Sequence, residues 1–219
     1  MLFRDRFEAG RVLASKLSEF SRKNDVVVLA LPRGGVPVGY EVAQALHAPL
    51  DVFVVRKLGT PGQEELAMGA LASGGTIVLN REVIQALGIS QSTIDAVAAR
   101  ENPELERRER EYRDGRPALQ VEGRTVILVD DGLATGSSMR VAIKALRKES
   151  AAQVVVAVPV ASPSACLEFE AEVDKIVCAA TPEPFWAVGQ WYRNFSQTTD
   201  EEVSELLARA AAASLPRAA

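Results

Sequence analysis

Residues 126–138 read VILVDDGLATGSS and contain the most informative pattern in the chain. The apolar run Val126–Val129 predicts a strand buried on both faces, as in a parallel sheet. Two acids follow, Asp130 and Asp131, and a loop of small residues then leads into a helix predicted to begin near Ser137. This order is typical of an α/β fold, in which ligands bind beyond the carboxyl ends of the strands.

The rest of the chain repeats this alternation of buried strands and amphipathic helices. Further parallel strands are predicted at Val26–Leu31, Leu50–Val55, Val154–Val158 and Ile176–Ala180. Helical stripes of apolar residues are Val38, Val42, Ala45 and Leu46, then Met139, Ala142, Ile143 and Leu146, then Val203, Leu206, Leu207 and Ala210. The pattern predicts a mainly parallel central sheet flanked by helices.

Residues 54–112 do not follow the alternation. Segments 67–71 and 76–79 predict a hairpin inserted into the parallel scheme. Segments 92–100 and 103–112 predict two separate helices, with Asn102 capping the second and Pro103 at its first position. At the start of the chain, Asp5 and Glu8 have the spacing of a capping box for a helix that extends to Phe20.

Length and composition bound the class of protein. The 219 residues predict one domain (1–219), with a core at about 24–180, a segment at about 181–198 that covers it, and a final helix at 199–213. The 25 Lys and Arg against 29 Asp and Glu give a net charge of −4, which argues against nucleic acid as a partner. Neither a membrane span nor a signal peptide is predicted, so a cytoplasmic protein with reduced, packed Cys166 and Cys178 is expected.

The loop after the predicted strand 126–129 has the chemistry of a sugar-phosphate site. Its backbone amides and the helix N-terminus form a seat for an anion, to which Ala134, Thr135, Gly136, Ser137 and Ser138 contribute. The carboxylates of Asp130 and Asp131 would accept hydrogen bonds from ribose hydroxyls or bind a hard cation. A Walker loop has a different spacing and a lysine before the serine. The alternative is a capped surface turn with two solvated acids.

Two further segments carry cations at predicted strand ends. Arg33 precedes Gly34 and Gly35, whose small size lets backbone amides approach a ligand closely. Arg56 and Lys57 lead into a Gly- and Pro-containing loop that ends at Glu64 and Glu65, whose role is open. The alternatives are a plain strand-to-helix turn in the first case and a solvated loop in the second.

Aromatic residues are few, but five of the twelve lie between Phe185 and Phe195. Flat side chains can stack on a nucleobase, which makes Phe185, Trp186 and the neighbouring Val188 candidates for binding one. The alternative, given equal weight, is that these aromatics pack against the C-terminal helix or in a dimer interface. The only histidine, His47, is expected at a helix end and not at a catalytic position.

The strand, acid pair, small loop and Thr-Gly-Ser sequence of residues 126–138 resemble the phosphoribosyl-pyrophosphate motif of the type I phosphoribosyltransferases. The Pro-Arg-Gly-Gly segment is similar to that family's pyrophosphate loop, and residues 54–65 to its mobile catalytic loop. The segment after Pro182 resembles the hood that covers the base. In this order the resemblance spans roughly residues 25–200, and it is greatest to predicted bacterial phosphoribosyltransferases of unassigned substrate.

The resemblance implies a type I phosphoribosyltransferase fold and transfer of ribose 5-phosphate from phosphoribosyl pyrophosphate to a nitrogenous base. It implies that Asp130 and Asp131 hold the ribose and residues 134–138 the 5-phosphate. The pyrophosphate would lie against Arg33, Gly34, Gly35, Arg56 and Lys57. The catalytic set would be Arg56, Lys57, Asp130 and Asp131.

The resemblance also implies Mg²⁺, bound mainly through ligand oxygens with Asp130 and Asp131 as candidate ligands, and a homodimer. Where the hypoxanthine-guanine and xanthine enzymes carry an acid in the loop, this chain has Ala134, which counts against a 6-oxopurine acceptor. The alternative function is a non-catalytic regulatory protein of the same fold that senses phosphoribosyl pyrophosphate.

Overall fold

The computed structural model describes residues 2–214 and contains a central parallel sheet of five strands. The strands are β1 (Val26–Ala30), β2 (Leu50–Val52), β6 (Thr125–Val129), β7 (Gln153–Val160) and β8 (Lys175–Ala180). Their order in the sheet is β2-β1-β6-β7-β8, with every neighbouring pair parallel. The predicted parallel sheet is therefore confirmed, although the strand predicted at Leu50–Val55 was too long, since β2 ends at Val52 and Val55 begins another strand.

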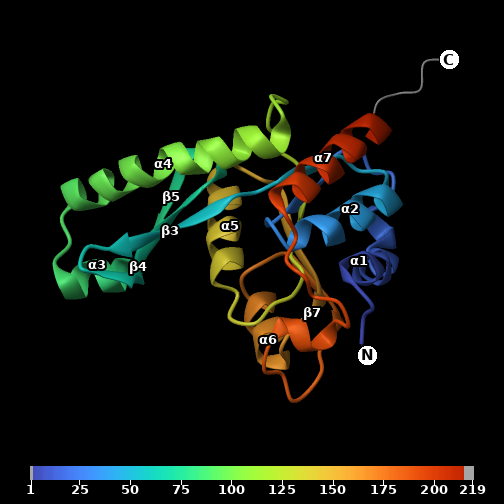
Figure 1. Cartoon of the computed structure of the whole chain (residues 1–219). Coiled ribbons are helices and arrows are strands. Elements are labelled where there is room, and N and C mark those ends of the chain that lie inside the picture. The colour runs from blue at the N-terminus through green and yellow to red at the C-terminus, as the bar shows by residue number, and fades with distance from the viewer. Residues whose placement is uncertain (1, 215–219) are drawn as a thin grey trace.

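Helices cover both faces of this sheet because alternate side chains of each buried strand point to opposite sides (Figure 1). On one face, Val26 and Val28 pack with α1 (Arg6–Ser15), α2 (Gly35–Leu46) and α7 (Asp200–Ser214). On the other, Val27 and Leu29 pack with α5 (Ser137–Lys148) and α6 (Pro163–Glu170). The continuous apolar runs of the sequence follow from this burial on both faces.

The helical stripes predicted for α5 and α7 are buried as expected. In α2, Ala43 is buried and Ala45 is exposed, so the predicted stripe was wrong at that one position. Asp5 caps α1 by accepting from the amide of Glu8 at 2.8 Å. This helix ends at Ser15 and is followed by a short 3-10 turn at Ser18–Phe20, so the predicted single helix to Phe20 was too long.

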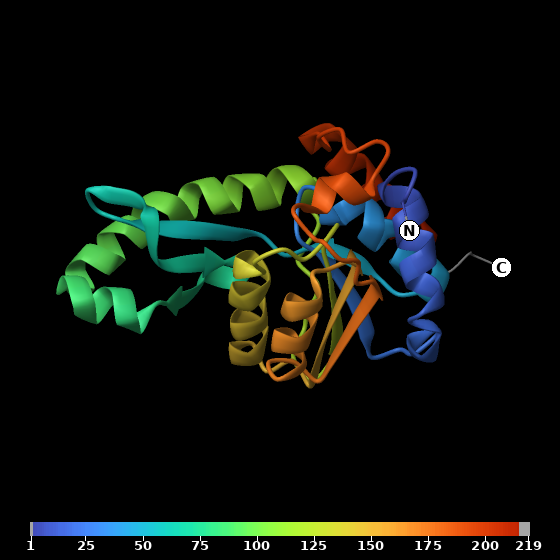
Figure 2. The same cartoon turned by 90° about the horizontal axis from the view of Figure 1, so that it is seen from below.

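A second unit projects from the body as an arm (Figure 2). It consists of the antiparallel strands β3 (Val55–Thr60), β4 (Gln63–Ala72) and β5 (Thr76–Leu79) with α3 (Arg81–Leu87) and α4 (Gln91–Arg113). The predicted hairpin is present as β4 and β5. The predicted loop after Lys57 is instead a second hairpin, in which β3 pairs with β4 across a turn at Gly62, whose φ is 78°.

Helix α4 is continuous through Pro103, so the prediction of two helices was wrong. Its buried residues lie on both sides of the proline, among them Ile94, Val97 and Leu105. The packing of this face against the hydrophobic core outweighs the backbone hydrogen bond that a proline cannot make.

Cys166 and Cys178 form a disulfide that links α6 to β8, so the prediction of reduced thiols was wrong. The two cysteines are twelve positions apart in sequence, and the parallel strand β8 brings the second one back beside α6. Within residues 2–214, no helix is both long enough and apolar enough to cross a membrane.

Candidate functional site: an acid pair at the carboxyl edge of the sheet

The acid pair, Asp130 and Asp131, lies where the central strands end. Strand β6 ends at Val129, which pairs with Ala30, the last residue of β1. The chain continues from β6 through the pair and then runs beside the end of β7, where the amide of Leu133 donates to the carbonyl of Val160 at 2.9 Å. The pair therefore occupies the edge at which parallel sheets bind ligands, as the sequence predicted.

Arg6 of α1 reaches this pair from the start of the chain. Its Nε donates to Oδ2 of Asp131 at 2.9 Å, and its Nη1 donates to the carbonyl oxygen of Ser196 at 2.7 Å. The guanidinium also lies 4.0 Å from the ring centroid of Phe195. With only 10% of its side chain exposed, Arg6 ties α1, the acid pair and the C-terminal segment into one unit.

Burial makes the acid pair expensive to ionise. It raises the pKa of Asp130 well above its ordinary value, and the neighbouring charge of Asp131 adds to this effect. Burial also raises the pKa of Asp131, although the charge and hydrogen bond of Arg6 oppose it. The amide of Asp131 donates to Oδ1 of Asp130 at 2.8 Å, and the hydroxyl of Tyr192 donates to the carbonyl of Asp131 at 2.5 Å. Closely spaced, desolvated carboxylates of this kind are typical of a functional site.

The two glycines after Arg33 pack directly against the acid pair. A Cβ at Gly34 would lie 2.1 Å from Oδ2 of Asp131, and one at Gly35 would lie 2.8 Å from the carbonyl oxygen of Val129. Helix α2 begins at Gly35, so its N-terminal amides lie beside the pair. These contacts show why glycine is needed at both positions, which is more than a plain strand-to-helix turn requires.

Arg33 itself points toward the start of α7. Its Nη1 lies 3.9 Å from Oδ2 of Asp200, and 38% of its side chain is exposed. Asp200 also accepts from the hydroxyl of Tyr112 at 2.5 Å. Arg33 is thus a partly solvated cation, close in sequence to the glycines that contact the acid pair.

The loop of residues 134–138 leads into α5, and its four non-glycine side chains are exposed. Gly136 has a φ of 69°, and a Cβ there would lie 2.5 Å from the ring of Phe169. Arg140 donates to the carbonyl of Thr135 at 2.8 Å and is itself paired with Glu168 and Glu172. The loop is therefore fixed in shape while the N-terminus of α5, an anion-binding feature, opens beside the acid pair.

The structure does not bring Arg56 and Lys57 to the acid pair. Both lie on β3 of the arm, where Arg56 pairs with Glu101 of α4 at 2.5 Å and Lys57 pairs with Glu65 at 3.0 Å. Within residues 2–214, neither cation forms a hydrogen bond or ion pair with Asp130 or Asp131. Glu65, whose role the sequence left open, is the ion-pair partner of Lys57, whereas the residue opposite Lys57 in the hairpin is Ala70.

The aromatic segment packs mainly against itself and the start of the chain. Phe185 stacks with Trp191 at a centroid distance of 6.4 Å, and Tyr192 lies 5.6 Å from Phe3. Trp186 differs from its neighbours, since 82% of it is exposed. Val188 lies over the loop, because a Cβ at Gly132 would lie 2.4 Å from its Cγ1. The aromatic segment therefore packs on the N-terminal segment, while packing in a dimer interface, the second part of the alternative interpretation, stays a prediction.

Arg6 and Tyr192 were not predicted as site residues. A signal for Arg6 was present, because it shares the helical spacing of the buried residues Ala9 and Leu13 and so places a charge on the buried face of α1. Its partner, 125 positions away, could not be read from the sequence. The sequence showed Tyr192 only as one of several clustered aromatic residues and gave no sign of its hydrogen bond to Asp131.

An acid pair, two helix N-termini that begin beside glycines, and a loop of small residues lie together at one edge of the sheet, a combination typical of sites for anionic ligands. The chain belongs to the phosphoribosyl transferase domain family, whose pattern matches residues 4–191. Its central parallel sheet with flanking helices has the architecture that the resemblance to type I phosphoribosyltransferases predicted.

Relatives support this assignment. In two strains of Mycobacterium tuberculosis, a protein named "Putative phosphoribosyl transferase" is 49% identical over 209 residues, which is 95% of this chain. The chain spans 47% of those relatives' length. The crystal structure of TT1426 from Thermus thermophilus is 44% identical, covers 95% of this chain and 99% of its own, and superposes with a TM-score of 0.84.

Proposed function

We propose that the protein transfers ribose 5-phosphate from phosphoribosyl pyrophosphate to a nitrogenous base and releases pyrophosphate. The observation that carries this proposal is the position of the desolvated acid pair. It lies between the N-terminus of α2 at Gly35 and the loop that opens α5 at Ser137. Two anion seats with hydroxyl-binding carboxylates between them match a ribose that carries phosphate at one end and pyrophosphate at the other.

In this proposal each group has one task. Asp130 and Asp131 accept hydrogen bonds from the ribose hydroxyls, and the amides and hydroxyls of residues 134–138 bind the 5-phosphate. The amide at Gly34 binds the pyrophosphate beside Gly35, whose own amide donates to the carbonyl of Leu31 at 3.0 Å, and Arg33 adds charge. As the bond to pyrophosphate breaks, positive charge develops on the ribose and negative charge on the leaving group, so the protein acts by positioning and by neutralisation.

The residues present fit a magnesium ion that the substrate itself carries. Residues 2–214 contain no group of three or more His, Cys, Asp or Glu side chains able to hold a metal ion. Asp130 and Asp131 could supply two oxygens, and pyrophosphate, ribose and water would supply the others, an arrangement common for Mg²⁺. When bound, the ion would neutralise charge on the leaving pyrophosphate.

Arg56 and Lys57 would reach the pyrophosphate only if they left their ion pairs with glutamates of the arm. Arg56 is held by Glu101 at 2.5 Å with 24% of its side chain exposed, and Lys57 is more exposed and paired with Glu65. A pyrophosphate carries more negative charge than either carboxylate. We therefore propose that the arm moves toward the acid pair when the substrate binds, which would also exclude water.

The acceptor base would bind under the segment that contains Phe185, Trp186 and Val188. Val188 already covers Gly132, the residue that follows the acid pair. The indole of Trp186 is exposed and free to stack on a base, since its aromatic neighbours pack among themselves. We propose a homodimer as the working form, on the basis of the family alone.

Pyrophosphate release measured over a panel of purine and pyrimidine bases tests the proposed activity. We expect release that depends on phosphoribosyl pyrophosphate, on Mg²⁺ and on one class of base. Binding of phosphoribosyl pyrophosphate without release on any base would overturn the enzyme assignment and favour the sensing function. Asp95→Asn, at an exposed position on α4, is the control for a harmless loss of one carboxylate.

A further inference from the structure

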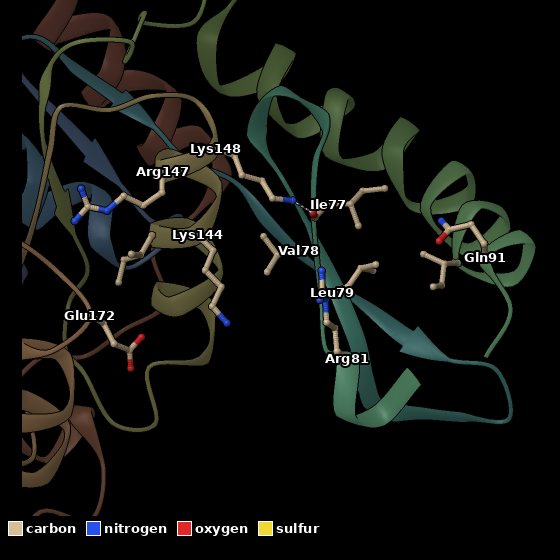
Figure 3. A pocket seen from close by; sticks show the side chains of 11 residues that line it. Ile77, Val78, Leu79, Arg81, Gln91, Lys144, Arg147, Lys148 and Glu172 are labelled. Atoms are coloured by element: carbon tan, nitrogen blue, oxygen red, sulfur yellow. Dashed lines mark hydrogen bonds between the residues drawn. The ribbon is translucent and has the colours of Figure 1, made fainter. Parts of the chain in front are cut away.

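A cavity of about 610 Å³ lies between the arm and the body, far along α5 from the loop that begins this helix (Figure 3). Its walls come from β5, from Arg81 at the start of α3, from Gln91 and Ile94 of α4, and from the second half of α5. Lys144 of α5 lies seven positions after Ser137, which corresponds to roughly 10 Å along a helix. The cavity is therefore separate from the acid pair and from the proposed phosphate loop.

Strand β5 forms the middle of this cavity because it is the edge strand of the three-stranded sheet. The side chain of Val78 points toward α5, whereas Ile77 and Leu79 point to the α4 side (Figure 3). Neighbouring residues of a strand direct their backbone groups to opposite sides. The amide of Asn80 donates to the carbonyl oxygen of Met68 in β4, so the backbone groups of Ile77 and Leu79 point away from β4. The edge of β5 thus presents free amides between apolar side chains.

The charges around the cavity are predominantly positive. Arg81, Lys144, Arg147 and Lys148 line it, against the single acid Glu172. Arg147 turns away from β5 to pair with Asp174, and Glu172 pairs with Arg140 (Figure 3). In the part of the chain that the structure describes, the side chains of Lys144 and Arg81 form no hydrogen bond or ion pair. Two unpaired cations, one from each side, are left at the cavity.

Lys148 decides which kind of ligand fits. It reaches across from α5 and donates to the carbonyl oxygen of Ile77 at 2.7 Å. An added β-strand would need that carbonyl, so the lysine blocks strand addition, as charged side chains do at many sheet edges. A partner with a positively charged surface would be repelled by the cations that line the cavity. A small molecule with negative charge and an apolar body meets neither obstacle.

We propose that this cavity is a binding site for a small organic anion, such as an aromatic phosphate or carboxylate. Its charged group would lie between Lys144 and Arg81, near the free amides of β5. Its apolar part would pack on Leu79, Ile94 and Ile143. The cavity volume falls within the range of small-molecule sites. Because the ligand would touch both α5 and the arm, binding would join the two.

A fluorescence titration with 8-anilinonaphthalene-1-sulfonate, itself an aromatic anion, tests the proposal on the full chain. We expect saturable binding that phenyl phosphate displaces and phosphoribosyl pyrophosphate does not. The double variant Lys144→Gln/Arg81→Gln should weaken binding at least tenfold. Gln91→Glu, which adds an acid at the rim, should weaken it several-fold. The charge-matched control Lys16→Gln/Lys23→Gln should bind within twofold of the parent.

All of these substitutions are at exposed positions, so the variants should fold, and circular dichroism will verify this. The proposal is overturned if the parent chain shows no saturable binding, if Lys144→Gln/Arg81→Gln binds like its control, or if phosphoribosyl pyrophosphate displaces the dye. The first two results would leave the proposed transferase activity untouched, because they concern residues outside the acid pair and its loops.

Discussion

Arg6 donates from Nε to Oδ2 of Asp131 over 2.9 Å, although 125 positions separate the two residues. This ion pair joins the first helix to the end of the central strand β6. The same guanidinium bonds to Ser196 and packs on Phe195, so the acid pair is oriented by both ends of the described chain. The geometry of the site therefore depends on a residue outside the loops that would touch the substrate.

Arg6→Gln should destabilise the fold and weaken the site together. Its removal leaves Asp131 desolvated without a counter-charge, which costs on the order of 2–4 kcal/mol at a mostly buried pair. Urea unfolding followed by circular dichroism measures this loss. Arg4→Gln is the control, because 65% of the Arg4 side chain is exposed and its removal should change stability by less than about 0.5 kcal/mol. Equal effects of the two substitutions would show that Arg6 has no special role.

Gly34→Ala should impair ligand binding with little loss of helix α2. The new Cβ would lie 2.1 Å from Oδ2 of Asp131, so the carboxylate must move. We expect the affinity for phosphoribosyl pyrophosphate, measured by calorimetry, to fall at least tenfold. Gly88→Ala is a control for binding: with φ at +60° it costs backbone strain at the end of α3, but its Cβ meets nothing within 4 Å, so the affinity should stay at the parent value. Unchanged affinity in Gly34→Ala would rule out close packing of this loop on the acid pair as a requirement for binding.

Pro103→Ala should stabilise the protein. Pro103 lies inside the continuous helix α4, where a proline removes one backbone hydrogen bond and costs up to about 3 kcal/mol. We expect a gain of about 1–2 kcal/mol in the free energy of unfolding. Pro163→Ala is the matched control, since Pro163 opens α6, where proline is well tolerated and no gain is expected. A loss of stability in Pro103→Ala would indicate that α4 is not one continuous helix.

Reduction of the disulfide between Cys166 and Cys178 should lower the melting temperature. A cross-link that closes a loop of this length typically contributes about 3 kcal/mol, mainly through the unfolded state. Thermal unfolding with and without dithiothreitol measures the effect, and mass spectrometry counts the free thiols. In Cys166→Ser the reductant should have no effect. Two free thiols in the untreated protein would contradict the disulfide.

The sequence predicted those parts of the fold that follow from local periodicity. The five parallel strands are apolar because both of their faces are buried, and the acid pair follows β6 directly in the chain. Both features could therefore be predicted from the sequence. The expected helix break at Pro103 failed because tertiary packing on Ile94 and Leu105 outweighs a local preference. The disulfide was missed because its partners meet only through the parallel return of β8.

The main features of the site that the sequence did not predict are ion pairs between residues far apart in the chain. No local pattern connects Arg6 with Asp131, or Arg56 with Glu101. Residues 54–65 were predicted as a loop because Gly and Pro are common in loops, yet only Pro61 and Gly62 form the turn between two strands. The pairing of β3 with β4 supplies the hydrogen bonds that make this segment extended.

Calorimetric titration of phosphoribosyl pyrophosphate in the presence of Mg²⁺ tests most directly whether the acid pair binds the ribose. We predict saturable binding to the parent chain and to Asp95→Asn. We predict a loss of at least a hundredfold in Asp130→Asn and in Asp131→Asn, since each would lose a charged acceptor of ribose hydroxyls. Parent-like affinity in both Asn variants, with the fold intact by circular dichroism, would show that the acid pair does not bind the ribose.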